Sequence, residues 1–300
     1  MGKLQEIKVA NLIATWAGLP GNLRNDTNIS TLVIKHFLGF PWIEKHLDPD
    51  ASNPGILTLK GNPSDLELAK IRIIDLAETL FNLRRVKGLN ECLQRMQTVD
   101  NIEPTLAELH IGKMLYANDW TFRFVSPSGG RGDDYDLQIR YWNQAVCGDV
   151  KCKIESPIPD SNSITRTLTR SRDQLPADKP GVFFVKFPQS WMEHPDWQRT
   201  TVQGALDFFA QGTGRIISVA FYVEPIRLIG MVTEEGRHYV AQQGHYFYEI
   251  ANPRRRFCQH VDCKFFEVWR PTVHASWSAM PPKYIRLFEF PKGMVGHEKE

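Results

Sequence analysis

The sequence lacks any apolar run long enough to cross a membrane. A transmembrane helix needs about 20 consecutive, mostly apolar residues, and no stretch of this 300-residue chain approaches that length. The first residues, 1–6, also lack the apolar run of a secretory signal peptide. We therefore expect a protein that has no membrane partner.

Cysteine is also scarce. The chain has five cysteines, an odd number for a long sequence without an export signal. Secreted disulfide scaffolds carry more cysteines in shorter chains, whereas reduced thiols are usual inside the cell. This pattern predicts free thiols and a cytoplasmic protein.

Charge of one sign is not in excess, because the formal net charge is only +2. A dedicated nucleic-acid-binding protein is usually more basic, so any such binding would depend on a local patch. The apolar content of 42% and the charged content of 23% are those of an ordinary globular protein. A chain of this length forms one large domain or two.

The most informative pattern is a pair of strands joined by a short polar turn within residues 132–155. Side chains alternate along a strand, so Asp149, Lys151 and Lys153 share one face and the apolar residues between them share the other. A partner strand beginning at Asp136 would bring a second carboxylate beside Asp149. The hairpin therefore predicts two acids and a lysine at one end of a sheet.

Two carboxylates and a lysine suit metal-assisted hydrolysis. Magnesium prefers oxygen ligands and keeps several waters, so one or two carboxylates plus a phosphate hold it. A nearby lysine orients water and stabilises charge on the phosphate. The alternative is a solvated polar face with an ordinary surface ion pair, which the hairpin alone favours because acid-x-lysine is common by chance.

The elements around the hairpin give a regular order. A helix is predicted over 103–116, with Pro104 in its first turn, and a strand over 120–125. After the hairpin come a helix over 163–174 and a buried strand over 181–187. The predicted order is helix, three strands, helix, strand.

This order, with an acid on the first helix and acid-x-lysine on the third strand, resembles the PD-(D/E)XK, or restriction-endonuclease-like, nuclease superfamily. The resemblance covers roughly residues 103–187 and extends toward Glu224. It implies catalytic roles for Glu108, Asp136, Asp149 and Lys151, with the three acids as metal ligands.

The resemblance also adds accessory residues and shows two departures. Gln174 matches a glutamine found in some branches of the family, and Lys153 lies near the site. Tyr135 stands where a proline is usual, and Asp149 stands where glutamate is commoner.

The implied fold class is α/β, with an αβββαβ core and a mixed sheet. We expect an α-helical N-terminal region at 1–100, the nuclease-like core at 101–225 and a β-rich C-terminal extension at 226–300. Further helices are predicted over 4–17, 29–38, 64–86 and 200–211, and further strands over 215–223, 227–233, 237–242 and 246–250. In the helix over 200–211, Val202, Leu206, Phe209 and Ala210 are expected to face inward.

Two groups of arginines are candidates for nucleic-acid binding. Arginine binds phosphates through paired hydrogen bonds, and such contacts position a nucleic acid without reading its sequence. A solvated helix face or loop is the alternative for each group. The candidate residues are Arg166, Arg170 and Arg172 in the helix after the hairpin, and Arg254, Arg255 and Arg256 near the C-terminus.

The predicted function is therefore a nuclease that uses Mg²⁺ or Mn²⁺, with DNA favoured over RNA by resemblance only. A homodimer or a partner protein stays open. One rival is a catalytically inactive domain of the same fold that acts as a binding or assembly module, which the near-neutral charge favours.

The other rival is a zinc-stabilised interaction protein. Cys258, His260 and Cys263 offer soft ligands at close spacing, but a structural zinc site needs four. His245 or His274 would have to supply the fourth. Buried free cysteines with an incidental histidine are the favoured interpretation.

Overall fold

A computed structural model describes residues 26–47, 57, 63–98, 102–126, 132–141, 144–153, 158–233, 236–244 and 246–257. The chain divides into two compact units, one within Met1–Asn82 and Pro282–Glu300, the other within Leu83–Pro281. Among the described residues, no helix combines the length and apolar character that a bilayer span requires.

The described part of the first unit is helical. It contains α2 (Asp26–Leu38), α3 (Phe40–His46) and most of α4 (Pro63–Leu83). Gly39, with φ of 86°, separates α2 from α3, a conformation that glycine adopts without steric cost. The predicted helices over 29–38 and 64–86 are thus confirmed with shifted ends. The predicted helix over 4–17 lies outside the described residues.

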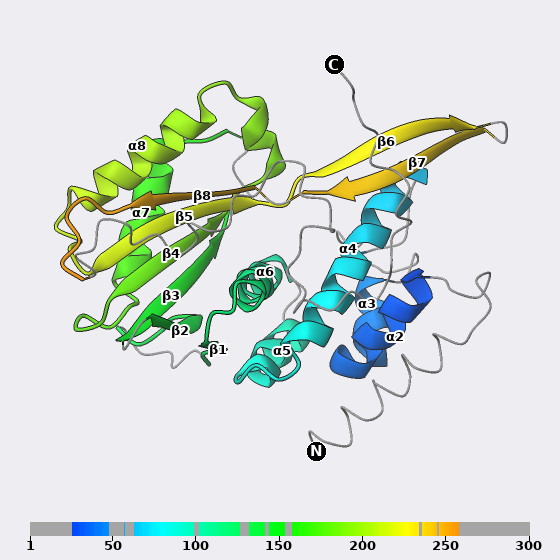
Figure 1. The fold of residues 1–300 in the computed structure, drawn as a ribbon, viewed down its shortest axis with the longest axis horizontal. Coiled ribbons are helices and arrows are strands. Elements are labelled where there is room, and N and C mark those ends of the chain that lie inside the picture. Colours follow the sequence, from blue (N-terminus) through cyan, green and yellow to red (C-terminus); the bar gives the residue numbers. More distant parts are fainter. Residues whose placement is uncertain are drawn as a thin grey trace. The chain divides into compact units, whose positions relative to one another are not determined.

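The second unit is built on a six-stranded mixed sheet (Figure 1). Its order is β1-β2-β3-β4-β5-β8, in which β3, β4 and β5 run parallel and the other pairs are antiparallel. The chain is therefore of mixed α/β class, as predicted. The strands are β1 (Phe122–Phe124), β2 (Leu137–Tyr141), β3 (Gln144–Cys152), β4 (Gly181–Lys186), β5 (Ile216–Val223) and β8 (Tyr246–Ala251).

Helices cover both faces of this sheet (Figure 1). On one face, Phe183 and Val185 of β4 pack into the apolar core formed with α7 (Ser161–Arg172) and α8 (Trp197–Phe209). On the other face, the Tyr222 hydroxyl donates to the carbonyl of Ala107 at 3.0 Å, in α6 (Glu103–Ala117). A short 3-10 helix, η2 (Gln189–Glu193), precedes α8.

From α6 to β4 the elements follow one another as helix, three strands, helix and strand, which confirms the predicted order. The preceding helix α5 (Leu89–Thr98), expected in the N-terminal region, belongs to the second unit and packs against α6.

The chain after β5 contributes to two sheets. It first forms β6 (Ile226–Thr233) and β7 (Gly236–Gln243), which pair with each other as a two-stranded antiparallel sheet. It then returns as β8, which pairs with β5. The strand expected in a C-terminal extension is thus the outer strand of the main sheet.

The buried face of α8 differs from the predicted one. Leu206 is 41% exposed and Ala210 is exposed, so the prediction that both face inward is wrong. Phe209 is buried as predicted, and the helix also buries Trp197, Thr201, Gly204, Ala205 and Phe208. A Cβ at Gly204 would lie 2.9 Å from Cβ of Ile164, so glycine allows α7 and α8 to approach closely. The buried residues follow helical spacing from Trp197 to Phe209, so α8 packs with a different apolar stripe from the one predicted.

Candidate active site

The β2–β3 hairpin brings Asp136 next to Asp149. Leu137 pairs with Gly148 across the two strands, and the Asp136 N–H donates to the Gly148 carbonyl at 3.1 Å. The Asp136 carboxylate also accepts the backbone N–H of Val150 at 2.7 Å. One carboxylate is therefore fixed to the strand that carries the other.

Asp149 has one satisfied oxygen and one unsatisfied oxygen. Its side chain is almost fully buried, and its Oδ1 accepts the Lys151 ammonium at 2.9 Å. Its Oδ2 is buried and has no hydrogen-bond partner within 3.5 Å in the described part of the chain, although Ser171 and Asp136 lie close enough to lower the pKa of the carboxyl. Buried polar atoms of this kind are rare, because an unmet hydrogen bond is costly, so the oxygen is available as a ligand for a cation.

Gln174 links Lys151 to the segment before β2. Its side-chain oxygen accepts the Lys151 ammonium at 3.0 Å, and its backbone carbonyl accepts the N–H of Asp134 at 3.0 Å. Gln174 follows the end of α7, so this helix positions both the lysine and the approach to Asp136. Lys151 itself is partly exposed, with 29% of its side chain accessible.

Lys153 contacts the other end of α7. Its ammonium donates to the Ser163 hydroxyl at 2.9 Å and reaches the Ser163 carbonyl at 3.3 Å. Asp160 caps this helix by accepting the N–H groups of Asn162 and Ser163. Lys153 therefore anchors the start of α7.

Glu108 lies near the two aspartates but is held by other residues. From α6 it accepts a hydrogen bond from Arg95 of α5, and the Cys92 thiol lies 3.7 Å from the same oxygen. The carboxylates of Glu108, Asp136 and Asp149 do not form a group in which every ligand atom lies within 4.8 Å of the others. The structure thus joins the two aspartates and Lys151 closely and leaves Glu108 at their margin.

The acids of this cluster resist ionisation. Burial, followed by the charges of Asp149 and Glu108, raises the pKa of Asp136 well above its usual range. Burial also raises the pKa of Asp149 and of Glu108, although Lys151 and Arg95 respectively oppose the effect. For Lys151, burial lowers the pKa, but Asp149 and Asp136 outweigh it and the net shift is upward. The three carboxyl groups therefore lie together, and Lys151 and Arg95 do not fully offset the cost of burying their negative charges.

The donor set fits a small, hard divalent cation. Two adjacent carboxylates, one of them with an unsatisfied oxygen, are ligands that Mg²⁺ and Mn²⁺ prefer. A divalent charge would also offset the repulsion that, together with burial as the larger cause, raises the pKa of Asp136. Asp136 and Asp149 are the residues that would hold it, and Glu108 would need to leave Arg95 to join them.

Tyr135 has a packing role. It is 5% exposed and belongs to the apolar core with Cys147, Leu168 and Leu175. Burial, with a contribution from Cys147, raises its pKa to about 12. The Tyr135 ring therefore fixes the backbone next to Asp136 to the apolar core.

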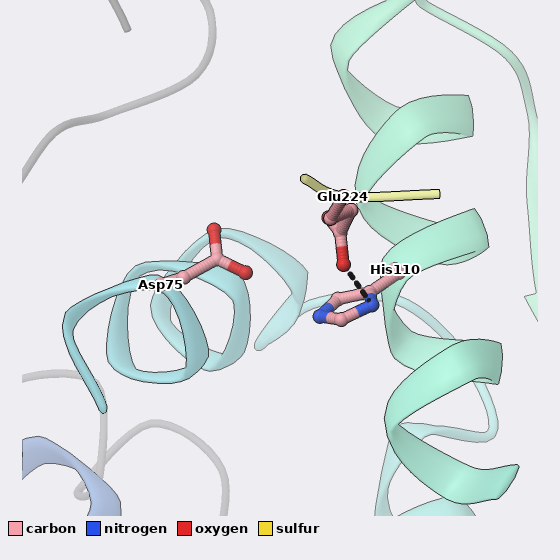
Figure 2. Close-up of side chains that lie close together, drawn as sticks. All are labelled: Asp75, His110 and Glu224. Atoms are coloured by element: carbon pink, nitrogen blue, oxygen red, sulfur yellow. Dashed lines mark ion pairs between the residues drawn. The ribbon is translucent and has the colours of Figure 1, made fainter. Parts of the chain in front are cut away.

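A second cluster of charged residues joins α6 to the end of β5, and sequence reasoning missed it. Glu224 makes an ion pair with His110 (Figure 2) and another with Lys113 at 3.3 Å. The Lys113 side chain is completely buried. Asp75, also drawn there, belongs to α4 in the first unit. No local motif marks these residues, because they are far apart in the sequence.

The candidate arginines have different surroundings. Arg166 and Arg170 are exposed on α7, four residues apart, and helical spacing puts Arg170 on the same face as Ser163. Arg172 pairs with its neighbour Asp173 at 3.2 Å. Arg166 and Arg170 thus lie on the helix that holds both Lys151 and Lys153.

The C-terminal arginines contact backbone groups. Arg254 donates to the carbonyl of Ala210 at the end of α8, at 3.1 Å, and Arg255 donates to the Asn252 carbonyl at 3.1 Å. The backbone N–H of Arg256 donates to the Gly214 carbonyl at 2.7 Å. These contacts give Arg254 and Arg255 a structural role.

The proposed zinc ligands Cys258, His260, Cys263, His245 and His274 lie outside the described residues. The described cysteines, Cys92, Cys147 and Cys152, are free thiols.

No protein-family model and no curated protein sequence matches this chain.

Proposed function

We propose that this protein is a nuclease that hydrolyses phosphodiester bonds with Mg²⁺ or Mn²⁺, on a core of the PD-(D/E)XK type. The observation that carries the proposal is the cluster of Asp136, Asp149 and Lys151, in which two carboxylates lie together and a lysine bonds one of them at 2.9 Å. The order of elements from α6 to β4 supports it.

Each residue has a chemical role in this proposal. Asp136 and Asp149 would hold the cation, with Glu108 completing or tuning the site. A bound cation would act as a Lewis acid and lower the pKa of a water molecule at the site. Lys151, fixed by Asp149 and Gln174, orients the attacking water and stabilises the negative charge that develops on the phosphate.

The exposed side chains of α7 support a nucleic-acid substrate. Arg166 and Arg170 project from the helix whose two ends bind Lys153 and Lys151. Cations spaced along such a surface neutralise successive phosphates and are indifferent to sequence. The family resemblance favours DNA over RNA, and we propose that the protein acts as a homodimer or with a partner protein.

The test is cleavage of plasmid, linear duplex, single-stranded DNA and RNA with Mg²⁺ or Mn²⁺. Wild type is compared with Asp149→Asn and Lys151→Met, and with Arg199→Met as a control that removes the same charge from the exposed surface of α8. Cleavage that Asp149→Asn and Lys151→Met abolish, and Arg199→Met retains, supports the proposal. Equal cleavage by all four proteins rejects the site.

A catalytically inactive module of the same fold is the second candidate. The observation that favours it is the engagement of Glu108 by Arg95, which keeps this carboxylate from the two aspartates. Titration with Mn²⁺ separates the two candidates. An inactive module would show no binding that depends on Asp136 and Asp149, whereas a nuclease would lose binding in Asp149→Asn.

A further inference from the structure

Arg95 connects a helix outside the predicted catalytic core to the candidate site. It lies on α5, and its Nη2 donates to Oε2 of Glu108 on α6. The pair is largely enclosed, with 24% of the Arg95 side chain and 10% of the Glu108 side chain accessible. The Cys92 thiol, one turn before Arg95, approaches the same oxygen at 3.7 Å.

The other terminal nitrogen of Arg95 is unused. Nη1 is buried, and no acceptor reaches it among the residues that the structure describes. Guanidinium groups bind carboxylates and phosphates through two parallel hydrogen bonds, so a buried guanidinium that makes one bond has capacity for another anion. A purely structural ion pair would be expected to satisfy both nitrogens, because each buried orphan donor is costly.

The charges of the site indicate what that anion is. Glu108, Asp136 and Asp149 are three potential negative charges, and Lys151 and Arg95 are two positive ones. The ionised site is thus negative by one charge. A divalent cation would make it positive by one, and a single phosphodiester group would restore neutrality. A neutral ligand would leave the positive charge uncompensated in a poorly hydrated place.

We propose that Arg95 is a phosphate-binding residue that changes partner when the site is loaded. Without a cation it pairs with Glu108. When Asp136 and Asp149 bind the cation, Glu108 turns toward it, and the released guanidinium binds the phosphodiester through both nitrogens. This inference rests on the proposed nuclease function and makes phosphodiester binding depend on prior cation binding.

The experiment measures binding without cleavage. A fluorescent duplex oligonucleotide with phosphorothioate linkages is titrated with wild type, Arg95→Gln and Arg95→Lys, with Mg²⁺ and with chelator. Arg199→Gln, which removes the same charge from the exposed surface of α8, is the matched control. Calorimetry measures Mg²⁺ affinity in each protein, and thermal melting checks that each is folded.

We expect Mg²⁺ to tighten oligonucleotide binding by wild type and by Arg199→Gln. Arg95→Gln should weaken the Mg²⁺-dependent binding by about tenfold to a hundredfold, the range for a charge-assisted hydrogen bond, while it still binds Mg²⁺. Arg95→Lys should recover part of the loss, because it restores the charge but not the paired geometry. In chelator, wild type and Arg95→Gln should bind equally weakly.

Two results overturn the inference and are distinguishable. If folded Arg95→Gln binds the oligonucleotide as wild type does in Mg²⁺, Arg95 only joins α5 to α6, and the nuclease proposal survives. If wild type binds neither Mg²⁺ nor the oligonucleotide, the nuclease proposal itself fails, and Arg95 has no phosphate to bind.

Discussion

The carboxylate of Asp136 accepts the backbone N–H of Val150 at 2.7 Å. This bond ties a side chain at the start of β2 to the strand that carries Asp149 and Lys151. Backbone N–H groups of a strand normally pair with a neighbouring strand. Here the Asp136 carboxylate accepts the Val150 N–H in place of a backbone carbonyl, so the sheet fixes the position of this side chain. The two aspartates are therefore held together even though their charges repel each other.

Burial of Asp136, together with that repulsion, predicts a pH-dependent stability of the metal-free protein. The folded pKa of Asp136 is raised above its usual value near 4, so between the two values the native state binds more protons than the unfolded state. Stability should then fall as pH rises through this window, by about 1.4 kcal/mol for each tenfold change in proton affinity. Urea denaturation with chelator from pH 5 to 8 measures it.

The matched variant for this experiment is Asp136→Asn, whose amide oxygen can still accept the Val150 N–H. Relative to wild type, this variant should become more stable as pH rises. If the free energy of unfolding changed with pH in the same way in wild type and in Asp136→Asn, Asp136 would carry no uncompensated charge.

Gln174 should act as a positioning residue for Lys151. Its side-chain oxygen accepts one Lys151 proton at 3.0 Å, so Gln174→Ala should lower kcat of the proposed nuclease by about tenfold, in line with one lost orienting hydrogen bond. KM and Mg²⁺ affinity should be unchanged. Gln174→Glu, which still accepts this bond, should shift the pH profile instead. Equal loss in both variants would point to damaged structure near Asp134.

The basic face of α7 should control the salt dependence of nucleic-acid binding. If Arg166 and Arg170 each contact one phosphate, each substitution by alanine should reduce the slope of log K against log salt by about 0.9 for duplex DNA. Arg254→Ala is the control, since its guanidinium bonds the Ala210 carbonyl at 3.1 Å. Unchanged slopes in Arg166→Ala and Arg170→Ala would place the nucleic acid elsewhere.

Replacing Gly204 by alanine should destabilise the protein, although alanine is the best helix-forming residue. Alanine there would put a Cβ 2.9 Å from both Ile164 Cβ and the Ser161 carbonyl, so α7 and α8 would have to separate. We expect Gly204→Ala to cost about 1–3 kcal/mol of unfolding free energy, the usual range for overpacking. Gln203→Ala, on the exposed side of the same helix, should have little effect. Thermal or urea denaturation of both variants measures these changes, and a Gly204→Ala protein as stable as wild type would contradict the prediction.

The ion pair of Lys113 and Glu224 should be far more costly to break than the one between Glu103 and Lys186, although both measure 3.3 Å. Lys113 is fully buried, so Glu224→Ala should cost about 3–5 kcal/mol by removing a carboxylate that pairs with this buried ammonium and with His110. The other pair is partly exposed, and Glu103→Ala should cost under about 1 kcal/mol. Similar losses in the two variants would contradict this account.

Local patterns in the sequence predicted most elements of the second unit. Alternation in β2 and β3 predicted that Asp136 and Asp149 meet, because a hairpin register follows from a short turn. The position of β8 was not predictable in the same way, because a short strand does not encode its partner. The inward position predicted for Leu206 was wrong because two apolar stripes fit helical spacing in α8, and the structure buries the stripe that carries Phe208. Arg95 was missed because its partnership with Glu108 forms between helices.

The pairing of β8 with β5 has a consequence for synthesis on the ribosome. All eight residues of β5 are buried, yet one of its edges is covered only when the chain has passed the β6–β7 hairpin and reached Ala251. A nascent chain released earlier would present an apolar strand with unpaired backbone groups, which is a template for aggregation. Expression trials that stop near residue 225 should therefore yield insoluble protein, and those of the full chain should not.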